Sequence, residues 1–215
     1  MIVEQILKKI TPQFETDATG HDIHHILRVL NVARKIQKIE GGDLETIELA
    51  ALLHDISDHK FNGGKLNAGG EIAYNMLIDL NYDKEKALKI KYIVDNVSYK
   101  GSSTPAEMNS IEGMIVQDAD RLDAIGAIGI ARTFAYGGNK NQPIHDPELK
   151  AKDHKTFDEY VNSKSSTINH FYEKLLLLSD RLNTETGKQI GKQRHQFMLN
   201  YLDQFFNEWN YNIEN

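Results

Sequence analysis

Cysteine is absent from this chain of 215 residues, which excludes disulfide bridges and any site built on a thiolate, whether for a metal or for nucleophilic catalysis. An excess of basic charge is absent too, since 31 acidic residues against 25 Lys and Arg give a formal net charge of −6. Proteins that grip a nucleic-acid backbone usually carry a basic surface, so we expect no polymeric nucleic acid as a partner. An anionic ligand would have to be met by local cations or by a bound metal.

Long apolar segments are lacking as well. Uncharged apolar runs such as residues 175–178 are far shorter than the roughly 20 residues that cross a bilayer. Residues 1–5 show neither the basic start nor the apolar stretch of a signal peptide. We therefore expect a soluble, cytoplasmic protein without membrane contact, in an oligomeric state that the sequence does not indicate. The apolar fraction of 40% suffices for a core, and the length suits one domain over residues 1–215.

The alternation of apolar and polar residues that marks half-buried strands is also missing, and helical spacing takes its place. We therefore predict an all-α fold. A run of apolar residues at 49–53 indicates that the third helix, capped by Asp43, is buried on most sides. The helices expected in the first half of the chain cover residues 2–10, 23–36, 44–55, 68–80 and 83–97.

The segment Thr104–Glu107 carries two signals of a helix start, a capping box and a proline at the first helical position. This helix is expected to continue, through a bend, into residues 124–136, after which Gly137-Gly138 end the pattern. Residues 137–155 are predicted to form a long loop, which is either a lid or a surface insertion. Helices follow over residues 156–213.

The last of these helices is expected to be long and to turn one apolar stripe toward the core. The stripe recurs at spacings of three and four residues, which is typical of packing rather than of a cofactor site. Its members are Phe197, Met198, Tyr201, Leu202, Phe205 and Trp209.

Side chains that can bind metals gather at three places, residues 21–25, His54-Asp55 and residues 118–123. Each place alone has an ordinary explanation, as a satisfied helix histidine, a polar helix end or a solvated acidic face. His54-Asp55, however, follows directly on the buried apolar run. Burying a histidine and a carboxylate is costly unless they are paired or bind a metal, so the pattern favours a metal site.

The order of these motifs resembles the HD-domain metal-dependent phosphohydrolases. Three segments, residues 20–29, 51–56 and 117–126, are similar to the three motifs of that family. Residues 182–187 and 194–198 are similar to a bacterial subgroup of small stand-alone HD proteins, some of which are nucleotide pyrophosphohydrolases. The resemblance covers nearly the whole chain. It implies a compact multi-helix bundle whose metal-site core spans about residues 20–136.

The resemblance implies one divalent cation held by four ligands, His25, His54, Asp55 and Asp120, with Asp118 as the alternative to Asp120. Two imidazoles and two carboxylates suit Mn²⁺ first, and Fe²⁺, Co²⁺, Ni²⁺ or Mg²⁺ as alternatives. Two open positions on such an ion would accept a water and a phosphate oxygen. The second metal of dinuclear HD phosphodiesterases is not expected, because no histidine occurs between His59 and His145. The Gly-Tyr-Pro signature of cyclic-dinucleotide phosphodiesterases is missing too.

Further roles follow from position and chemistry. Asp58, four residues after His54, is expected to orient or deprotonate the attacking water beside the catalytic pair His54-Asp55, unless it is a surface carboxylate. For each arginine or lysine, a solvated surface position is the alternative to phosphate binding. Asp123 either binds a cation or a sugar hydroxyl or pairs with Arg121, and His24 receives no role. The residues expected to bind substrate are His21, Arg28, His59, Lys60, Lys65, Asp123 and Arg132.

The resemblance also implies a small-molecule nucleotide as substrate. A (deoxy)nucleoside triphosphate, cleaved to monophosphate and pyrophosphate, is the first expectation because of the subgroup. The alternatives are a nucleotidase or phosphodiesterase acting on another nucleotide, a nuclease acting on an oligonucleotide end, and a non-catalytic module that senses a nucleotide. The presence of every ligand type in the expected order argues against the last of these.

Overall fold

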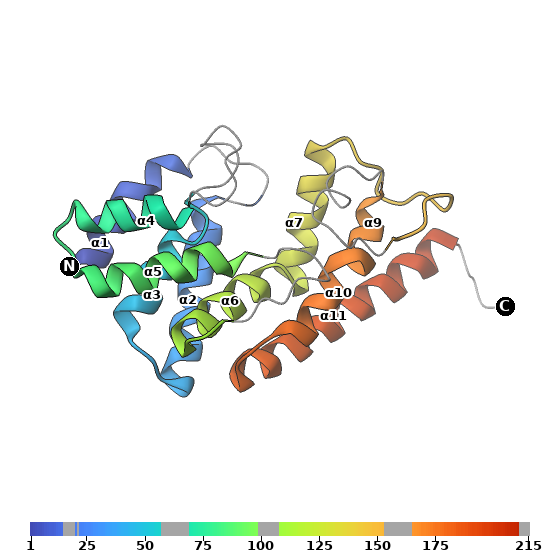
Figure 1. Ribbon diagram of the computed structural model, residues 1–215. Helices are drawn as coiled ribbons and strands as arrows, with labels where there is room; N and C mark the ends of the chain where they lie inside the picture. Colours follow the sequence, from blue (N-terminus) through green and yellow to red (C-terminus); the bar gives the residue numbers. More distant parts are fainter. Residues whose placement is uncertain (15–19, 21, 57–68, 99–107, 153–164, 211–215) are drawn as a thin grey trace.

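The computed structural model describes residues 1–14, 20, 22–56, 69–98, 108–152 and 165–210, and all regular elements in these ranges are helical (Figure 1). The all-α prediction is therefore confirmed. The α-helices are α1 (Ile2–Ile10), α2 (Ile23–Glu40), α3 (Leu44–Leu53), α4 (Gly69–Ile78), α5 (Lys84–Val97), α6 (Ile111–Asp123), α7 (Gly126–Asn139), α9 (Thr167–His170), α10 (Leu176–Leu178) and α11 (Glu185–Asn210). Two 3₁₀ turns, η1 (Thr11–Gln13) and η3 (Ser179–Arg181), and one π-helical turn, η2 (Phe171–Leu175), join them.

Polar caps set the first residue of several helices. The side chains of Asp22, Asp43, Asp83 and Ser110 each accept a hydrogen bond from the backbone N–H three residues ahead. One such cap is worth about 1 kcal/mol because it satisfies an N–H group that the helix leaves open. The predicted capping box at residues 104–107 lies outside the described residues. The helix that was expected to start there begins at Ile111 instead. The backbone of Ser110 is extended, so Ser110 lies outside the helix, and its hydroxyl caps the first turn.

Helix α3 lies at the centre of the first half of the molecule. It packs against α1, α2, α5 and α6, and residues 49–53 are completely buried, as their composition predicted. Burying one such aliphatic side chain stabilises the fold by about 1.5–3 kcal/mol. Helix α3 ends at Leu53, two residues earlier than expected, and His54 follows as its C-cap. His54-Asp55 therefore lies at the C-terminal end of α3, directly after its completely buried residues.

The second half of the chain packs against α6. Figure 1 shows α6 between the group α1 to α5 and the group α7 to α11, and contacts join it to α2, α3, α5, α7 and α11. The long helix α11 is present as predicted, but its apolar stripe faces the core only in part. Met198 and Leu202 are buried, whereas Phe197 is 51% and Trp209 44% exposed. The C-terminal end of the stripe instead packs on His145, which lies edge-on to Phe205, Phe206 and Trp209.

Residues 140–152, the described part of the predicted loop after α7, contain no helix. Helix α7 nevertheless runs through Gly137-Gly138 to Asn139. Gly137 serves close packing, since a Cβ there would lie 2.3 Å from Oγ1 of Thr167. The loop is fastened to the following segment: the N–H groups of Thr167 and Ile168 donate to the carbonyls of Pro143 and Ile144, at 2.9 and 3.0 Å. These two backbone hydrogen bonds tie this part of the predicted loop to the start of α9.

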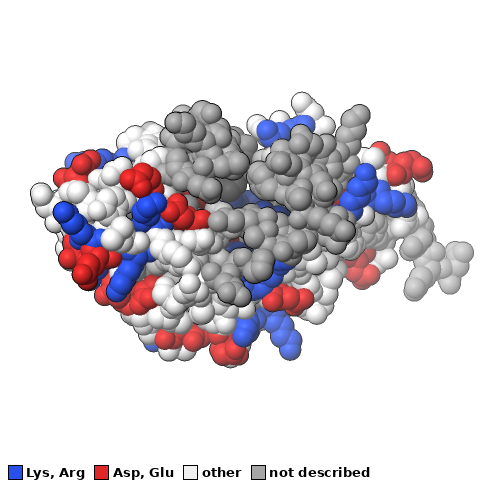
Figure 2. Space-filling model, viewed as in Figure 1, with Lys and Arg blue, Asp and Glu red and all other residues white. Residues whose placement is uncertain are grey.

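The surface carries both signs of charge. Figure 2 shows basic and acidic side chains interspersed over the described surface around α4 and α5. Ion pairs there include Lys91 with Asp95 at 3.0 Å and with Glu71 at 3.4 Å. No helix among the described residues is long and apolar enough to cross a membrane.

Candidate metal centre

Three helix ends converge at one buried point. His25 lies in the first turn of α2, His54 caps α3 with Asp55 beside it, and Asp120 lies near the end of α6. Nε2 of His25 lies 3.2 Å from Nε2 of His54, 3.3 Å from Oδ2 of Asp55 and 3.6 Å from Oδ1 of Asp120. Nε2 of His54 lies 3.5 and 3.6 Å from the same two oxygens. The structure therefore brings together the four residues predicted as metal ligands.

The two imidazoles are oriented by bonds at their other nitrogens. Nδ1 of His25 contacts Oδ2 of Asp123 at 2.7 Å, and Nδ1 of His54 contacts the carbonyl oxygen of Ala51 at 2.8 Å. Both partners accept hydrogen bonds, so each Nδ1 carries the proton and each Nε2 of a neutral ring presents a lone pair. Two lone pairs that face each other at 3.2 Å require a proton or a metal cation between them.

The donor set fits a divalent cation. Two ligand atoms at right angles around one ion, each ~2.1 Å from it, lie about 3 Å apart, which is close to the separation of the two Nε2 atoms. His25, His54 and Asp120 offer ligand atoms that all lie within 4.8 Å of one another. The imidazoles are almost inaccessible, whereas the side chains of Asp55 and Asp120 are 19% and 27% exposed. Solvent and a ligand can thus approach from the carboxylate side.

The charges at this point also favour a cation. Burial lowers the pKa of His54, but the negative charges of Asp55 and Asp120 outweigh it and raise that pKa to about 9. Burial raises the pKa of Asp120, yet the hydrogen bond and charge of His54 hold it below its usual value. Without a metal the cluster therefore binds a proton at neutral pH, and a divalent cation would take its place.

Asp123 is the centre of a second, adjoining group of charges, which we call the Asp123 cluster: Asp123, Arg28 and Arg132. Nε and Nη2 of Arg28 donate to the two carboxylate oxygens at 2.7 and 3.0 Å, and Nη1 of Arg132 donates to Oδ2 at 2.8 Å. Burial raises the pKa of Asp123, but hydrogen bonds from His25 and Arg28 hold it well below its usual range. The structure thus assembles three residues predicted to contact substrate. The arginines that pair with Asp123 are Arg28 and Arg132, whereas Nη1 of Arg121, the alternative partner, donates to the carbonyl of Arg181.

Asp118, the alternative metal ligand, has a different role. Its side chain is buried, and its oxygens accept hydrogen bonds from the backbone and side chains of Asn183 and Thr184 at 2.7–2.9 Å. These bonds hold the turn that leads into α11. They also give a physical role to Asn183 and Thr184, which lie in the segment 182–187 that is similar to the bacterial subgroup.

Lys174 was not predicted, yet it interacts electrostatically with two of the four candidate ligands, Asp120 and Asp55. It belongs to the π-helical turn η2, a conformation that occurs often at functional sites. Burial lowers the pKa of its ammonium, the charges of Asp120 and Asp55 raise it, and the charge of Arg132 lowers it. The sequence signal was weak, namely one lysine before the apolar run 175–178. Five predicted site residues, His21, Asp58, His59, Lys60 and Lys65, lie outside the described residues.

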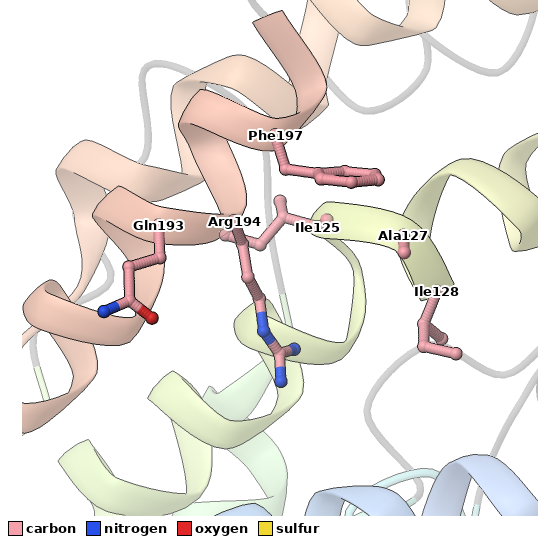
Figure 3. A pocket seen from close by; sticks show the side chains of 7 residues that line it. Ile125, Ala127, Ile128, Gln193, Arg194 and Phe197 are labelled. Atoms are coloured by element: carbon pink, nitrogen blue, oxygen red, sulfur yellow. The ribbon is translucent and has the colours of Figure 1, made fainter. Parts of the chain in front are cut away.

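A separate, open pocket of about 310 Å³ lies between the start of α7 and α11 (Figure 3). It contains none of the candidate metal ligands and is lined mainly by apolar groups, among them Ile125, Ile128 and Phe197. Arg194 projects from α11 and donates to the carbonyl of Leu122 at the end of α6. This contact ties α11 to the helix that carries Asp120 and Asp123.

Comparison with known proteins links this geometry to one family. The family model for the HD domain matches residues 22–125. Over 202 residues the chain is 37% identical to the uncharacterised Bacillus subtilis protein YpgQ, covering 94% of this chain and 90% of YpgQ. A crystal structure of YpgQ in complex with ADP is similar with a TM-score of 0.74, at 34% identity and with 96% of this chain and 97% of that one covered.

Two further crystal structures are similar over nearly the whole chain. An HD-superfamily hydrolase of Bacillus thuringiensis has a TM-score of 0.75 at 40% identity, with 97% of this chain and 96% of the other covered. A protein of Lactobacillus plantarum has a TM-score of 0.86 at 35% identity, with 98% and 97% covered.

Proposed function

The chain belongs to the HD-domain hydrolase superfamily, and from this premise we propose that it hydrolyses (deoxy)nucleoside triphosphates to monophosphates and pyrophosphate with the help of one divalent cation. The observation that carries the proposal is the pair of inward-facing imidazole nitrogens, 3.2 Å apart and flanked by Asp55 and Asp120. We assign His25, His54, Asp55 and Asp120 as the ligands. Mn²⁺ is the expected metal, because imidazole with carboxylate suits a cation of intermediate softness.

The reaction joins one water oxygen to the α-phosphorus and breaks the bond from that phosphorus to the bridging oxygen, which leaves with pyrophosphate. His25, His54, Asp55 and Asp120 would hold the divalent cation, which would supply Lewis-acid chemistry by acidifying water and withdrawing charge from a phosphoryl group. The contacts at Nδ1 hold the imidazole rings of His25 and His54 in the orientation that turns both Nε2 atoms toward the candidate metal position. Asp58 is proposed to accept the proton of the water. Burial lowers the pKa of the Lys174 ammonium, and the charges of Asp120 and Asp55 oppose that shift; Lys174 is proposed to meet the anionic phosphate in its protonated form.

Nucleotide chemistry is supported by the relative. The YpgQ crystal structure contains ADP, and this chain is similar to it over nearly its full length. A net charge of −6 makes dedicated cations necessary for a polyphosphate, and we assign His21, His59, Lys60 and Lys65 to that role as a prediction. ADP cannot release pyrophosphate, but it shares the nucleoside and the first two phosphates of the proposed triphosphate substrate.

The test is a turnover screen with the metal-stripped protein. Mn²⁺, Mg²⁺, Co²⁺ or Ni²⁺ is added with a panel of ribo- and deoxyribonucleoside tri-, di- and monophosphates and cyclic nucleotides, and phosphate is resolved from pyrophosphate. Reaction in ¹⁸O-labelled water locates the attack, because attack at the α-phosphorus places the label in the monophosphate. A His54→Ala preparation, purified in parallel, controls for contaminating phosphatases.

Pyrophosphate release from triphosphates, lost in the His54→Ala preparation, is the expected result. Phosphate release from monophosphates would retain the metal site but make the protein a nucleotidase, and opening of a cyclic nucleotide would make it a phosphodiesterase. Nucleotide binding without turnover under any of the four metals would overturn the proposal in favour of a sensor.

A further inference from the structure

We infer that Asp123 is a positioning residue that acts on the metal site through His25, and that Arg28 and Arg132 act on Asp123 instead of clamping the substrate. This inference rests on the proposed function, because it takes His25 as a metal ligand. The three residues that the sequence predicted to contact substrate would instead hold His25 in place from its Nδ1 side.

The contact with Asp123 determines the tautomer of His25. Asp123 is ionised and can only accept, so the contact of 2.7 Å requires that Nδ1 of His25 donates. A neutral imidazole that is protonated at Nδ1 has its lone pair at Nε2, the atom that faces His54, Asp55 and Asp120. A hydrogen bond to a carboxylate also makes the imidazole a better ligand. Asp123 thereby sets both the direction and the basicity of His25.

Two arginines hold the Asp123 carboxylate in place. Its side chain is 3% exposed, and an isolated carboxylate buried to this degree would be protonated instead of ionised. Arg28, one turn after His25 on α2, binds both oxygens with one edge of its guanidinium group, and Arg132 reaches Oδ2 from α7. Donors from two helices, α2 and α7, thus fix one carboxylate of α6. The Nε–Nη2 edge of Arg28, one of the two edges that could bind a phosphate bidentately, is therefore already occupied.

Arg132 has little freedom to leave Asp123. Its guanidinium side chain passes under Gly20, where an added Cβ would lie 2.9 Å from Nε and 3.0 Å from Cγ. Gly20 has φ +88°, a backbone conformation that glycine adopts easily. The side chain of Arg132 is 16% exposed, so it is packed in place beside the carboxylate.

The experiment measures Mn²⁺ affinity of the metal-stripped protein by titration calorimetry, with Asp123→Asn as the test variant. The amide keeps the shape of the side chain but loses the charge that holds the Nδ1 proton. We expect Mn²⁺ binding to weaken roughly 10- to 100-fold, the usual effect of removing such a partner of a ligand histidine. Wild-type Mn²⁺ affinity in a folded Asp123→Asn protein would overturn the inference.

Asp118→Asn is the matched control, because Asp118 is a buried, multiply bonded carboxylate on the same helix that does not contact the ligands. It should lower the melting temperature and leave Mn²⁺ affinity unchanged. Should Asp118→Asn fail to fold, Asp95→Asn takes its place, since Asp95 accepts from the N–H of Gly70 and from Lys91 on the other side of the bundle. Equal losses of Mn²⁺ affinity in Asp123→Asn and a folded control would show a general packing effect and would overturn the inference.

A second measurement separates the arginines from the substrate. At saturating Mn²⁺, Arg28→Gln should leave KM for the nucleotide within about 2-fold of wild type while Mn²⁺ affinity falls, with partial rescue in Arg28→Lys. A KM raised 10-fold or more at unchanged Mn²⁺ affinity would make Arg28 a substrate contact and would overturn this part. Mn²⁺ affinity can be measured without turnover. If the wild-type protein proves inactive but Asp123→Asn still weakens Mn²⁺ binding, the inference stands and only the proposed function fails.

Discussion

At the residue scale, the candidate site depends on which atom of each side chain faces inward. Nδ1 of His25 is engaged by Asp123 and Nδ1 of His54 by the carbonyl of Ala51, so both Nε2 atoms point to the same position. The spacing of residues along the chain predicts none of this. A histidine on a different helix face, or the other tautomer, would leave the same motif without a site.

His54→Ala or Asp55→Ala is expected to abolish metal binding and turnover while leaving helicity largely intact. Each variant removes one ligand from a set of four, whereas α3 ends before His54 and keeps its buried face. Metal titration and far-ultraviolet circular dichroism measure the two properties. His24→Ala is the matched control, because His24 is an exposed neighbour of His25 on the same helix. Near-wild-type turnover in either ligand variant would contradict the site assignment.

Lys60→Ala is expected to raise KM for a triphosphate more than it lowers kcat. A lysine that binds the phosphates equally in the ground state and the transition state contributes to affinity alone. Steady-state kinetics at saturating Mn²⁺ measures both constants, with Lys65→Ala in parallel. An unchanged KM in the Lys60→Ala protein would make this lysine a bystander.

At the element scale, helix ends and close helix contacts decide what the periodicity of the sequence leaves open. Helices α2, α3, α5 and α6 each start at a side chain that accepts an N–H three residues ahead. Two adjacent glycines of α7 differ in the space around them. Gly137 lets α7 approach Thr167, while a Cβ on Gly138 would meet nothing within 4 Å.

This difference predicts opposite effects of the same substitution at adjacent positions. Gly138→Ala should stabilise the protein by up to about 1 kcal/mol, because alanine favours a helix over glycine and open space lies beyond. Gly137→Ala should destabilise it by about 1–3 kcal/mol, since its Cβ would overlap Oγ1 of Thr167. Urea denaturation of the two variants measures the difference. Stabilisation by both would show that α7 and α9 do not pack as described.

The cap of α3 predicts a pH dependence. Bonds from the Thr46 hydroxyl, at 2.6 Å, and from its N–H, at 2.8 Å, lower the pKa of Asp43 below 3.8. A depressed pKa in the folded state means that the contribution is present above about pH 4 and is lost as pH falls through the folded-state value. Asp43→Ala should therefore cost about 1 kcal/mol at neutral pH and less near pH 3. Urea denaturation at both pH values tests this, and a penalty independent of pH would contradict it.

At the scale of the whole molecule, the candidate site joins α2, α3 and α6, and α6 in turn joins the two halves of the bundle. A metal that binds only the folded state should therefore stabilise the entire fold. At a free Mn²⁺ concentration 100 times Kd, linkage gives about 2.7 kcal/mol. Thermal denaturation should show a higher melting temperature with Mn²⁺, reversed by a chelator and absent in Asp120→Ala. An equal increase in the Asp120→Ala protein would place the binding elsewhere.

The amino-acid sequence by itself determined the helical class, most of the helix positions and the order of the metal-binding motifs. Local physics suffices for these, because apolar spacing, capping residues and the buried run at 49–53 act within a few turns of chain. The sequence prediction was wrong at the start of α6, which begins after the Ser110 cap. It was also wrong for Phe197 of α11, which was expected to face the core and is exposed.

Only the tertiary structure decided how the charged residues divide into roles. Asp118, Asp120 and Asp123 lie on one helix within two turns, yet the first holds the turn before α11, the second faces the imidazoles and the third supports His25. Lys174 comes to the same region from a turn far along the chain. The reason is physical: the role of a buried charge depends on its partners, and those partners arrive from segments that no local pattern connects.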